Sequence, residues 1–405
     1  MNILIVSAPA IESYTNLCYR FVEIGETAGY LQNQQHSVLI LDSLMMDPKI
    51  WLRELESKII DTDMLIFYHS GDTVSSAIHY ARHAKRIKPE IKCITYGIVS
   101  TFTPEVFTKR DAFDAVVIEG DWEVVLQELI LFYRSNLSLP IPNGSVVRIN
   151  GEWIEEKIPI RIPAWKWAFP ALELLPLENY RRKYEEGGSI PGIRGSFELS
   201  LSISRGCSYG CWFCPASRID GLVERRRPVR MAVEFIADAV NRYHFNQLAL
   251  FSACFTTDRD WVFSFCKLLS SHCPSIPWRC VTTLQDLDAG LLRAMAESGC
   301  WRIGIGVESL DPKFQSRIKK QVDLSRLSVL IHECLKAGIQ PVCFLLKGLP
   351  GQNLDEVNRD ADTLKFLGAS VRISKYINYS SAVTYHENDI SNHISREVKF
   401  IADEE

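Results

Sequence analysis

Short apolar runs alternate with longer amphipathic stretches from the start of the chain to about residue 135. The runs that predict buried strands are Ile3–Ser7, Ser37–Asp42, Met64–Tyr68, Lys92–Tyr96 and Ala115–Ile118. Helical periodicity lies between them, at Ile50–Ile60, Ser75–Ile87 and Trp122–Tyr133. This alternation is typical of βαβ units around a parallel sheet. We therefore predict a doubly wound, Rossmann-like α/β domain over residues 1–137.

A ligand site of such a domain is expected outside the carboxyl ends of its strands. The loops that would line it are Ser7–Asn16, His69–Val74, Gly97–Pro104 and Glu119–Asp121.

Residues 138–195 break the pattern and are rich in Pro, Gly and Trp, so we predict a linker there. It should contain a small hairpin, because Val146–Ile149 and Glu152–Glu155 flank an Asn-Gly pair, a strong two-residue turn signal. We expect Trp165 and Trp167 to pack the linker against a domain; the alternative is that they line a ligand pocket.

The alternation resumes after the linker. Its predicted strands are Glu198–Ser204, Gln247–Phe251, Trp278–Thr282, Trp301–Gly306, Gln340–Leu346 and Ser370–Ile373. Each but the last precedes a helical pattern, which predicts a partial (β/α)6 barrel over residues 196–375. The polar tail, residues 376–405, should cap a surface or fray.

Composition and charge exclude several classes of protein. With 47% apolar and 23% charged residues among 405, the chain reads as a globular protein. A net charge of -4 gives no basic footprint for nucleic acid. The longest apolar runs are strand-length, far below the roughly 20 residues of a membrane span, and the N-terminus lacks a secretory signal. We expect a cytoplasmic protein with no nucleic acid or membrane partner.

Three of the twelve cysteines are arranged differently from the rest. Most stand alone in apolar segments, as do Cys93, Cys280, Cys334 and Cys343, and these we predict to be buried thiols. By contrast, Cys207, Cys211 and Cys214 form a Cys-x3-Cys-x2-Cys run directly after an apolar strand.

Three thiolates on one tight loop suit three corners of a [4Fe–4S] cube. The fourth iron would stay open for a small molecule that coordinates through an amine and a carboxylate. The alternatives are a structural zinc site and plain buried thiols. Structural zinc needs four ligands, and no second Cys pair or Cys/His hairpin is apparent in the sequence.

The cysteine run, with Phe213 as its aromatic, resembles the cluster loop of the radical SAM (S-adenosylmethionine) superfamily, and the resemblance covers residues 196–373. It implies that the loop backbone beside Phe213 contacts the adenine. Ile303–Ser309 is similar to the fourth-strand motif of that family, which implies that Glu308 faces SAM. Leu346–Gly351 is similar to the turn after its fifth strand.

Two further segments of the second domain are informative. One departs from the pattern of that family, and the other is a run of basic residues. Relatives often end the second strand with acidic residues, where this chain has Ser252, the candidate for the SAM amino group, and Cys254, expected as a packed thiol. The basic run Glu224–Arg230 reads as a solvated helix start. The alternative is that it steers an anionic substrate or an electron donor, such as flavodoxin or ferredoxin, towards the cluster.

The front domain resembles the cobalamin-binding domain of the B12-binding radical SAM group, with Val117–Glu123 similar to that group's Gly-Glu-x-Glu turn. This implies that loops around Asp72, Gly97 and Gly120 face cobalamin. There is no Asp-x-His-x-x-Gly motif, and Tyr96–Ser100 replaces the usual paired glycines and histidine. The alternative is an inherited domain that has lost the cofactor.

Together the resemblances imply an enzyme that cleaves SAM reductively to a 5′-deoxyadenosyl radical. The principal hypothesis is a cobalamin-dependent methyltransferase acting on carbon or phosphorus of a small metabolite. A second is a cobalamin-independent radical enzyme that dehydrates, epimerises or rearranges its substrate, and a third is a non-catalytic iron–sulfur or zinc scaffold.

Overall fold

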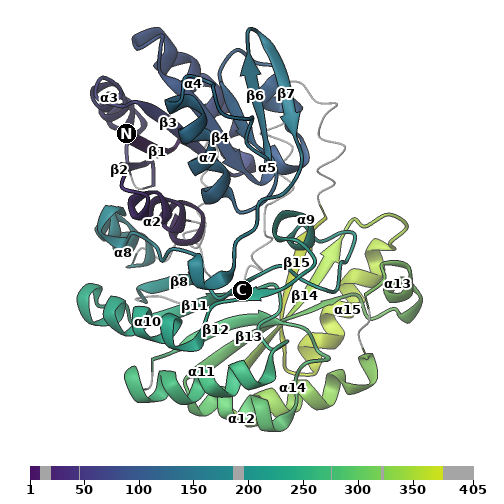
Figure 1. Cartoon of the computed structure of the whole chain (residues 1–405). Coiled ribbons are helices and arrows are strands. Elements are labelled where there is room, and N and C mark those ends of the chain that lie inside the picture. Colours follow the sequence, from purple (N-terminus) through teal and green to yellow (C-terminus); the bar gives the residue numbers. More distant parts are fainter. Residues whose placement is uncertain (10–19, 45, 186–195, 275, 321–322, 377–405) are drawn as a thin grey trace. The chain divides into compact units, whose positions relative to one another are not determined.

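The computed structural model describes residues 1–9, 20–44, 46–185, 196–274, 276–320 and 323–376 (Figure 1). The chain divides into two compact units, Met1–Gly195 and Ser196–Tyr376. Most of the predicted loop Ser7–Asn16 and, apart from Tyr376, the predicted tail lie outside the described residues.

The first unit is built on a seven-stranded sheet in the order β2-β1-β3-β4-β5-β6-β7. Its strands are β1 (Asn2–Ser7), β2 (Ser37–Asp42), β3 (Met64–His69), β4 (Lys92–Gly97), β5 (Ala115–Val117), β6 (Ser145–Ile149) and β7 (Glu152–Glu156). The first five pair in parallel, each within one residue of its predicted bounds. The order 2-1-3-4-5 is that of a flavodoxin-like sheet, whose ligand site is expected at the switch point between β1 and β3.

Two helical layers cover this sheet, since α2 packs on α7 and α3 on α4. The helices are α2 (Glu26–Asn33), α3 (Pro48–Ile59), α4 (Val74–Ile87), α5 (Ile98–Phe102), α6 (Glu105–Thr108) and α7 (Trp122–Arg134), with a π-helix, η1 (Arg20–Gly25), and a 3-10 turn, η2 (Gly71–Thr73). Helix α3 begins where the Asp47 side chain accepts a hydrogen bond from the Lys49 amide, 2.8 Å, and Pro48 takes the first helical position. The predicted loop Gly97–Pro104 contains a short helix, α5.

The segment predicted as a linker packs as part of the first unit. The hairpin β6–β7 forms as predicted, but β6 also pairs antiparallel with β5 and so covers what would be an open sheet edge. In α8 (Leu177–Glu185), the Tyr180 hydroxyl donates to the buried Asp42 carboxylate at 2.7 Å. Trp167 is buried as predicted, whereas Trp165 is 57% exposed and does not pack as a plug.

The second unit confirms the predicted partial barrel, with six parallel strands in sequential order (Figure 1). These are β8 (Glu198–Ser202), β11 (Gln247–Phe251), β12 (Trp278–Thr282), β13 (Cys300–Glu308), β14 (Gln340–Lys347) and β15 (Ser370–Lys375). The connecting helices are α10 (Val229–Tyr243), α11 (Arg259–His272), α12 (Ala289–Glu297), α13 (Pro312–Arg317), α14 (Leu327–Lys336) and α15 (Leu354–Phe366). Because the strands are parallel and consecutive, their carboxyl ends meet at one edge of the barrel.

Isolated cysteines pack in the two cores. Cys93, Cys280, Cys334 and Cys343 are all buried, which confirms their prediction as packed thiols. None of the described helices is long and apolar enough to cross a bilayer.

An ion pair closes the opposite, N-terminal end of the barrel. Glu198 is fully buried and accepts two hydrogen bonds from the Arg279 guanidinium, both of 2.7 Å. The Gln247 amide donates to the same carboxylate at 3.3 Å. These contacts join the first residues of β8 and β11 to β12.

Replacing Glu198 with Gln should destabilise the second unit by about 3 kcal/mol, because the largely buried Arg279 guanidinium would lose a carboxylate that accepts two of its hydrogen bonds. Urea unfolding of the full chain would measure the change. Glu234→Gln is the control: this carboxylate is 3.8 Å from Arg230 in an exposed pair, so the expected change is below about 0.5 kcal/mol. Equal effects of the two variants would contradict the account of this end of the barrel.

Candidate functional site

The cysteine loop leaves the barrel edge after β8 and is closed at its base. The two-residue strand β9 (Ser204–Arg205) pairs antiparallel with β10 (Arg225–Arg226), so the segment starts and returns at one place. The Cys207 amide donates to the Gly221 carbonyl at 3.0 Å. Gly206 has φ +93°, and a Cβ atom there would lie 2.2 Å from the Val223 carbonyl oxygen. A glycine is therefore required where the loop begins.

The loop brings together the three predicted cysteines, all half-buried and unpaired by disulfides. The Cys214 amide donates to the Cys211 carbonyl at 3.0 Å, which closes a tight turn between them. Burial raises the pKa of both thiols, and the nearby Cys211 and Cys207 contribute to raising that of Cys214, to about 11. These thiols therefore bind a metal at neutral pH only by releasing protons.

The chemical type of the three ligands is the feature of the loop that points to a cluster. In the described parts of the chain, no three His, Cys, Asp or Glu side chains are grouped closely enough to chelate one ion. An iron–sulfur cube spreads its corners, so its thiolate ligands need not meet at one point. The donor set, three soft thiols on one loop, fits three corners of a [4Fe–4S] cluster.

Phe213 anchors the far end of the loop. Its ring packs against an apolar cluster formed by Phe314, Ile318 and Leu349. The packing holds the Phe213 ring against the segments that follow β13 and β14. Contact of the backbone beside Phe213 with adenine stays a prediction.

Glu308, the predicted carboxylate, sits in a strained conformation at the end of β13. Its φ is +67°, which is uncommon outside glycine, and the β13–β14 register shifts between Gly306 and Glu308. Strained, bulged strand ends cluster at functional sites, because they aim a side chain that a regular strand would place elsewhere. Only 8% of Glu308 is exposed, so the carboxylate points inward at the barrel edge.

Neighbouring side chains hold the backbone around Glu308 in place. The Gln315 amide donates to the carbonyls of Val307, 2.6 Å, and Ser309, 2.5 Å. The Asp360 carboxylate accepts from the Leu310 amide at 2.8 Å. Hydrogen bonds to the residues before and after Glu308 therefore stabilise its strained backbone conformation.

Lys320 is a site residue that the sequence analysis missed. Its ammonium lies 3.3 Å from the Glu308 carboxylate, with both side chains almost buried. Burial lowers the pKa of Lys320, but Glu308 and the nearby Cys211 outweigh it and raise the pKa overall. Burial raises the pKa of Glu308 against the lowering effect of Lys320. A cation is therefore held between a carboxylate and the cysteine loop, where it can bind an anionic ligand group.

The other barrel residues singled out from the sequence hold the edge together. The Ser252 hydroxyl bonds to the Ser204 hydroxyl at 2.6 Å and accepts from the Cys254 amide at 3.2 Å. Cys254 is buried, as predicted. Assignment of Ser252 to the SAM amino group stays a prediction. In the turn after β14, the Gln352 side chain accepts from the Gly348 amide at 2.7 Å.

Arg226 and Arg227 of the basic run are structural, which corrects their interpretation as part of a solvated helix start, whereas Arg230 in the first turn of α10 is exposed as predicted. Arg227 is 1% exposed and donates to the Ser202 carbonyl at 2.7 Å. Arg226 bonds to the carbonyls of Phe255, 2.7 Å, and Cys254, 3.1 Å. With their donors engaged inside the fold, these arginines do not form a patch that steers an anion to the cluster.

In the first unit, the two predicted glycines are required by internal packing. Gly97 has φ +144°, and a Cβ atom there would lie 2.1 Å from the His69 carbonyl oxygen. Gly120 has φ +93°, and a Cβ atom there would lie 2.6 Å from the Ile160 carbonyl oxygen. Asp72 lies in η2, directly after β3. Contacts of these three residues with cobalamin stay predictions.

His69 is a polar residue at the same sheet edge that the sequence analysis did not single out. The ring is fully buried, stacks on Phe107 with centroids 4.6 Å apart, and burial lowers its pKa to about 3. Neither ring nitrogen has a hydrogen-bond partner in the described chain. A buried polar group without a hydrogen-bond partner lowers the stability of the fold. Its presence at the sheet edge where a doubly wound domain binds its ligand therefore needs an explanation.

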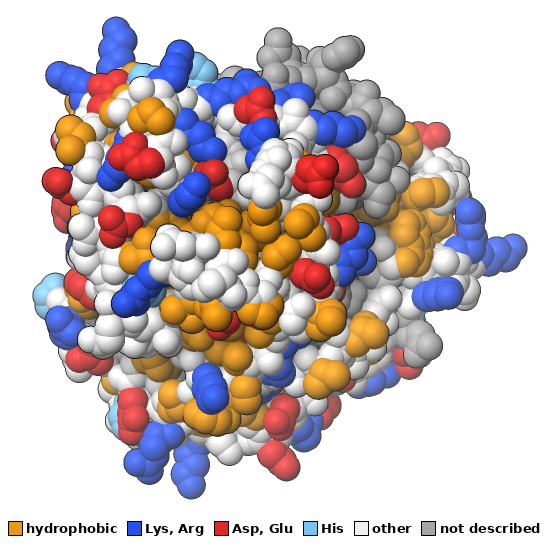
Figure 2. All heavy atoms as spheres, turned by 45° about the horizontal axis from the view of Figure 1, so that its top comes forward, with side chains coloured by type: hydrophobic (Ala, Val, Ile, Leu, Met, Phe, Trp, Pro, Cys, Tyr) orange, Lys and Arg blue, Asp and Glu red, His pale blue; other side chains and the backbone are white. Residues whose placement is uncertain are grey.

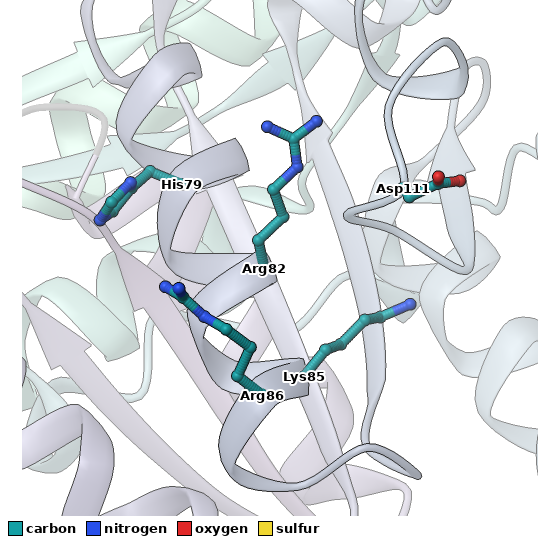
Figure 3. Close-up of a pocket in the computed structure, with 5 residues that line it drawn as sticks. All are labelled: His79, Arg82, Lys85, Arg86 and Asp111. Atoms are coloured by element: carbon teal, nitrogen blue, oxygen red, sulfur yellow. The ribbon is translucent and has the colours of Figure 1, made fainter.

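A separate hollow of about 450 Å³ lies on the first unit, between α4 and the turn before β5 (Figure 3). It is lined by His79, Arg82, Lys85, Arg86 and Asp111. Lys85 pairs with Asp114 at 2.9 Å, and Asp111 with Arg148 at 2.7 Å. None of the predicted site residues lines this hollow. On the face drawn in Figure 2, acidic and basic side chains are interspersed, and the coloured basic groups form no continuous belt.

Comparison with known proteins identifies the kind of domain that contains the cysteine loop. The family model of the radical SAM superfamily matches residues 201–364, which include the loop and Glu308. The match identifies this part of the chain as a radical SAM domain. The domain lies within the second unit, and the chain is therefore a radical SAM enzyme.

Two curated proteins and a solved structure are similar to this radical SAM protein. An uncharacterized methyltransferase of Pyrococcus horikoshii is 23% identical over 82% of this chain and 70% of its own length. The cytidylyl-2-hydroxyethylphosphonate methyltransferase of Streptomyces wedmorensis is 27% identical over 50% of this chain and 39% of its own. The solved radical SAM methyltransferase TsrM of Kitasatospora setae has a TM-score of 0.73 at 14% identity, over 93% of this chain and 73% of TsrM. The likeness to TsrM shows that the two chains share a fold.

Proposed function

We propose that this chain is a cobalamin-dependent radical SAM methyltransferase that acts at a carbon or phosphorus centre of a small molecule. The observation that carries the proposal is the pairing, in one chain, of a flavodoxin-like front sheet with a radical SAM barrel, the fold shared with TsrM. TsrM has been solved with cobalamin and a [4Fe–4S] cluster bound, and separately with tryptophan as substrate. Two relatives are also named methyltransferases.

In the barrel, Cys207, Cys211 and Cys214 would hold the cluster, whose chemistry, when bound, is to supply the electron that cleaves SAM. The Lys320 ammonium, 3.3 Å from Glu308, would pair with the carboxylate of the SAM methionine group. Glu308, aimed by its strained backbone, would accept hydrogen bonds from SAM. An electron donor such as flavodoxin or ferredoxin remains a proposal.

The front unit fits cobalamin through its sheet order and through His69. The switch point between β1 and β3 is where a doubly wound sheet binds its ligand, and His69 ends β3. The orphaned imidazole is a polar group whose hydrogen bonds are left for a ligand. Cobalamin, when bound, supplies the methyl group, and the loop at Ser70–Thr73 together with His69 would contribute to holding it. Close approach of the chain itself already accounts for Gly97 and Gly120, so their contact with cobalamin stays a prediction.

The test is retention of hydroxocobalamin by the anaerobically purified chain after gel filtration. About one cobalamin per chain is expected, both for the wild type and for a variant with alanine at all three loop cysteines, because the front sheet lies outside the radical SAM domain. Absence of stoichiometric cobalt from both would contradict the proposal. It would favour the cobalamin-independent radical enzyme instead.

Replacing His69 with Leu separates the two possible roles of this residue. The free energy of unfolding should rise or change by less than about 1 kcal/mol, because no internal hydrogen bond is lost and an unsatisfied polar group is removed. Cobalamin affinity should fall about tenfold if one hydrogen bond to the ligand is lost. Unchanged affinity would show that His69 does not contact the cofactor.

A further inference from the structure

Three donors converge on one oxygen of Asp286 at the carboxyl edge of the barrel. The Tyr209 hydroxyl donates to Oδ2 at 3.0 Å, the Thr283 hydroxyl at 2.8 Å and the Cys254 thiol at 3.1 Å. The three donors come from three places: the cysteine loop, the segment after β12 and the segment after β11. Asp286 therefore ties the loop to the ends of two neighbouring strands.

Tyr209 lies in the short span between the first two cysteines of the motif. This span includes Gly210, with φ +57°. The base of the loop is fixed by the β9–β10 pair, and its far end by the packing of Phe213. The hydrogen bond from Tyr209 to Asp286 is a side-chain contact that restrains the span between Cys207 and Cys211.

The surroundings of the acceptor, Asp286, are themselves held in place by further hydrogen bonds. Cys254 Sγ also lies 3.3 Å from the Thr282 hydroxyl, and its carbonyl accepts from Arg226 of β10 at 3.1 Å. Because Arg226 belongs to the strand on which the cysteine loop returns, loop and barrel edge are connected twice. Cys254, which donates to Asp286, is therefore held both by the barrel edge and by the strand on which the loop returns.

We propose that Asp286 and Tyr209 are positioning residues for the cluster: Asp286 fixes Tyr209, and Tyr209 fixes the backbone that carries Cys207 and Cys211. Their bond keeps two of the three thiols at the spacing that the cluster needs. Its loss lets this span move, so that iron dissociates faster and SAM meets a less uniform cluster. The proposal rests on assignment of the cluster to the three loop cysteines, as in the proposed function.

The experiment compares full-length wild type with Tyr209→Phe, Asp286→Ala, Asp286→Asn and the Tyr209→Phe/Asp286→Ala double variant, all reconstituted anaerobically with iron and sulfide. Loss of visible cluster absorbance in excess chelator gives the rate of iron release. We expect about a tenfold faster release for Tyr209→Phe and for Asp286→Ala, the size of effect of one hydrogen bond to a charged group. The double variant should be no faster than the single ones, because both changes break the same contact.

Two further comparisons separate positioning from general damage. Asp286→Asn keeps an oxygen that accepts from Tyr209, so its release rate should lie close to that of the wild type. Asp288→Asn changes a carboxylate two residues away that caps α12 and does not contact Tyr209, and it should leave iron release unchanged. The electron paramagnetic resonance (EPR) spectrum of the reduced cluster should broaden in Tyr209→Phe, while urea unfolding of its cluster-free form stays at the wild-type midpoint.

Unchanged iron release in Tyr209→Phe would overturn the inference, as would faster release in Asp288→Asn. Additive effects in the double variant would also overturn it. A wild-type chain that assembles no cluster would instead overturn the proposed function on which the inference rests. The two failures are thus told apart by the wild-type sample alone.

Discussion

Alanine in place of Cys207, Cys211 or Cys214 is expected to abolish formation of 5′-deoxyadenosine from SAM under dithionite. Each variant removes one of three ligands from a cluster that has no spare thiol on its loop. The loss should exceed the roughly 10- to 100-fold effect of removing an outer-shell partner of a metal ligand. Iron and sulfide content of the reconstituted protein should fall in parallel, and product should be measured by chromatography.

A matched control is Cys334→Ala. This thiol is fully buried in α14, so its removal tests whether any lost cysteine has the same effect. Cluster content and SAM cleavage should both stay near wild type. Full activity in one of the loop variants, or loss of activity in Cys334→Ala, would contradict the assignment of the three ligands.

Replacing Lys320 with Met should have the next largest effect, and it should appear in stability as well as activity. The change leaves Glu308 buried without its counter-charge, which costs about 3–5 kcal/mol when a buried pair is broken. Burial already raises the pKa of Glu308, and the variant loses the lowering effect of Lys320. The folded variant therefore binds a proton more tightly than the unfolded chain, so its stability should fall further as pH rises above the ordinary pKa of a glutamate. Urea unfolding at several pH values measures this.

The double variant Lys320→Met/Glu308→Gln separates folding from SAM binding. With no charge left unpaired, most of the lost stability should return. SAM cleavage should not return, because the ammonium and the carboxylate proposed to contact SAM are both absent. Recovery of activity together with stability would mean that the pair serves the fold alone.

The sequence predicts correctly those helices and strands that the spacing of hydrophobic residues is enough to determine. Each of the five parallel strands of the first unit lies within one residue of its prediction, because buried parallel strands are continuous apolar runs with polar loops at both ends. Pairing of β6 with β5 was not predictable. Nothing in the apolar pattern of Val146–Ile149 specifies which sheet edge a hairpin joins, so residues 138–195 read as a linker.

The residues of the candidate site also fall into those that the sequence predicts and those that it does not. The three cysteines and Glu308 could be found from spacing and motif, since both lie within short stretches of sequence. Lys320 could not, because its role depends on the fold that returns it to Glu308, and a lysine in a polar segment reads as a solvated charge. Arg227 was misread for the same reason: only the structure shows that a charge in a basic run is buried.

The central claim is that three loop thiols hold a [4Fe–4S] cluster whose open iron binds SAM. EPR of the anaerobically reconstituted and reduced chain, recorded with and without SAM, tests it most directly. We expect the signal of a [4Fe–4S] cluster, with a shape that changes on addition of SAM. A [4Fe–4S] signal that does not change on addition of SAM, or a zinc centre with four ligands in place of the cluster, would contradict this claim.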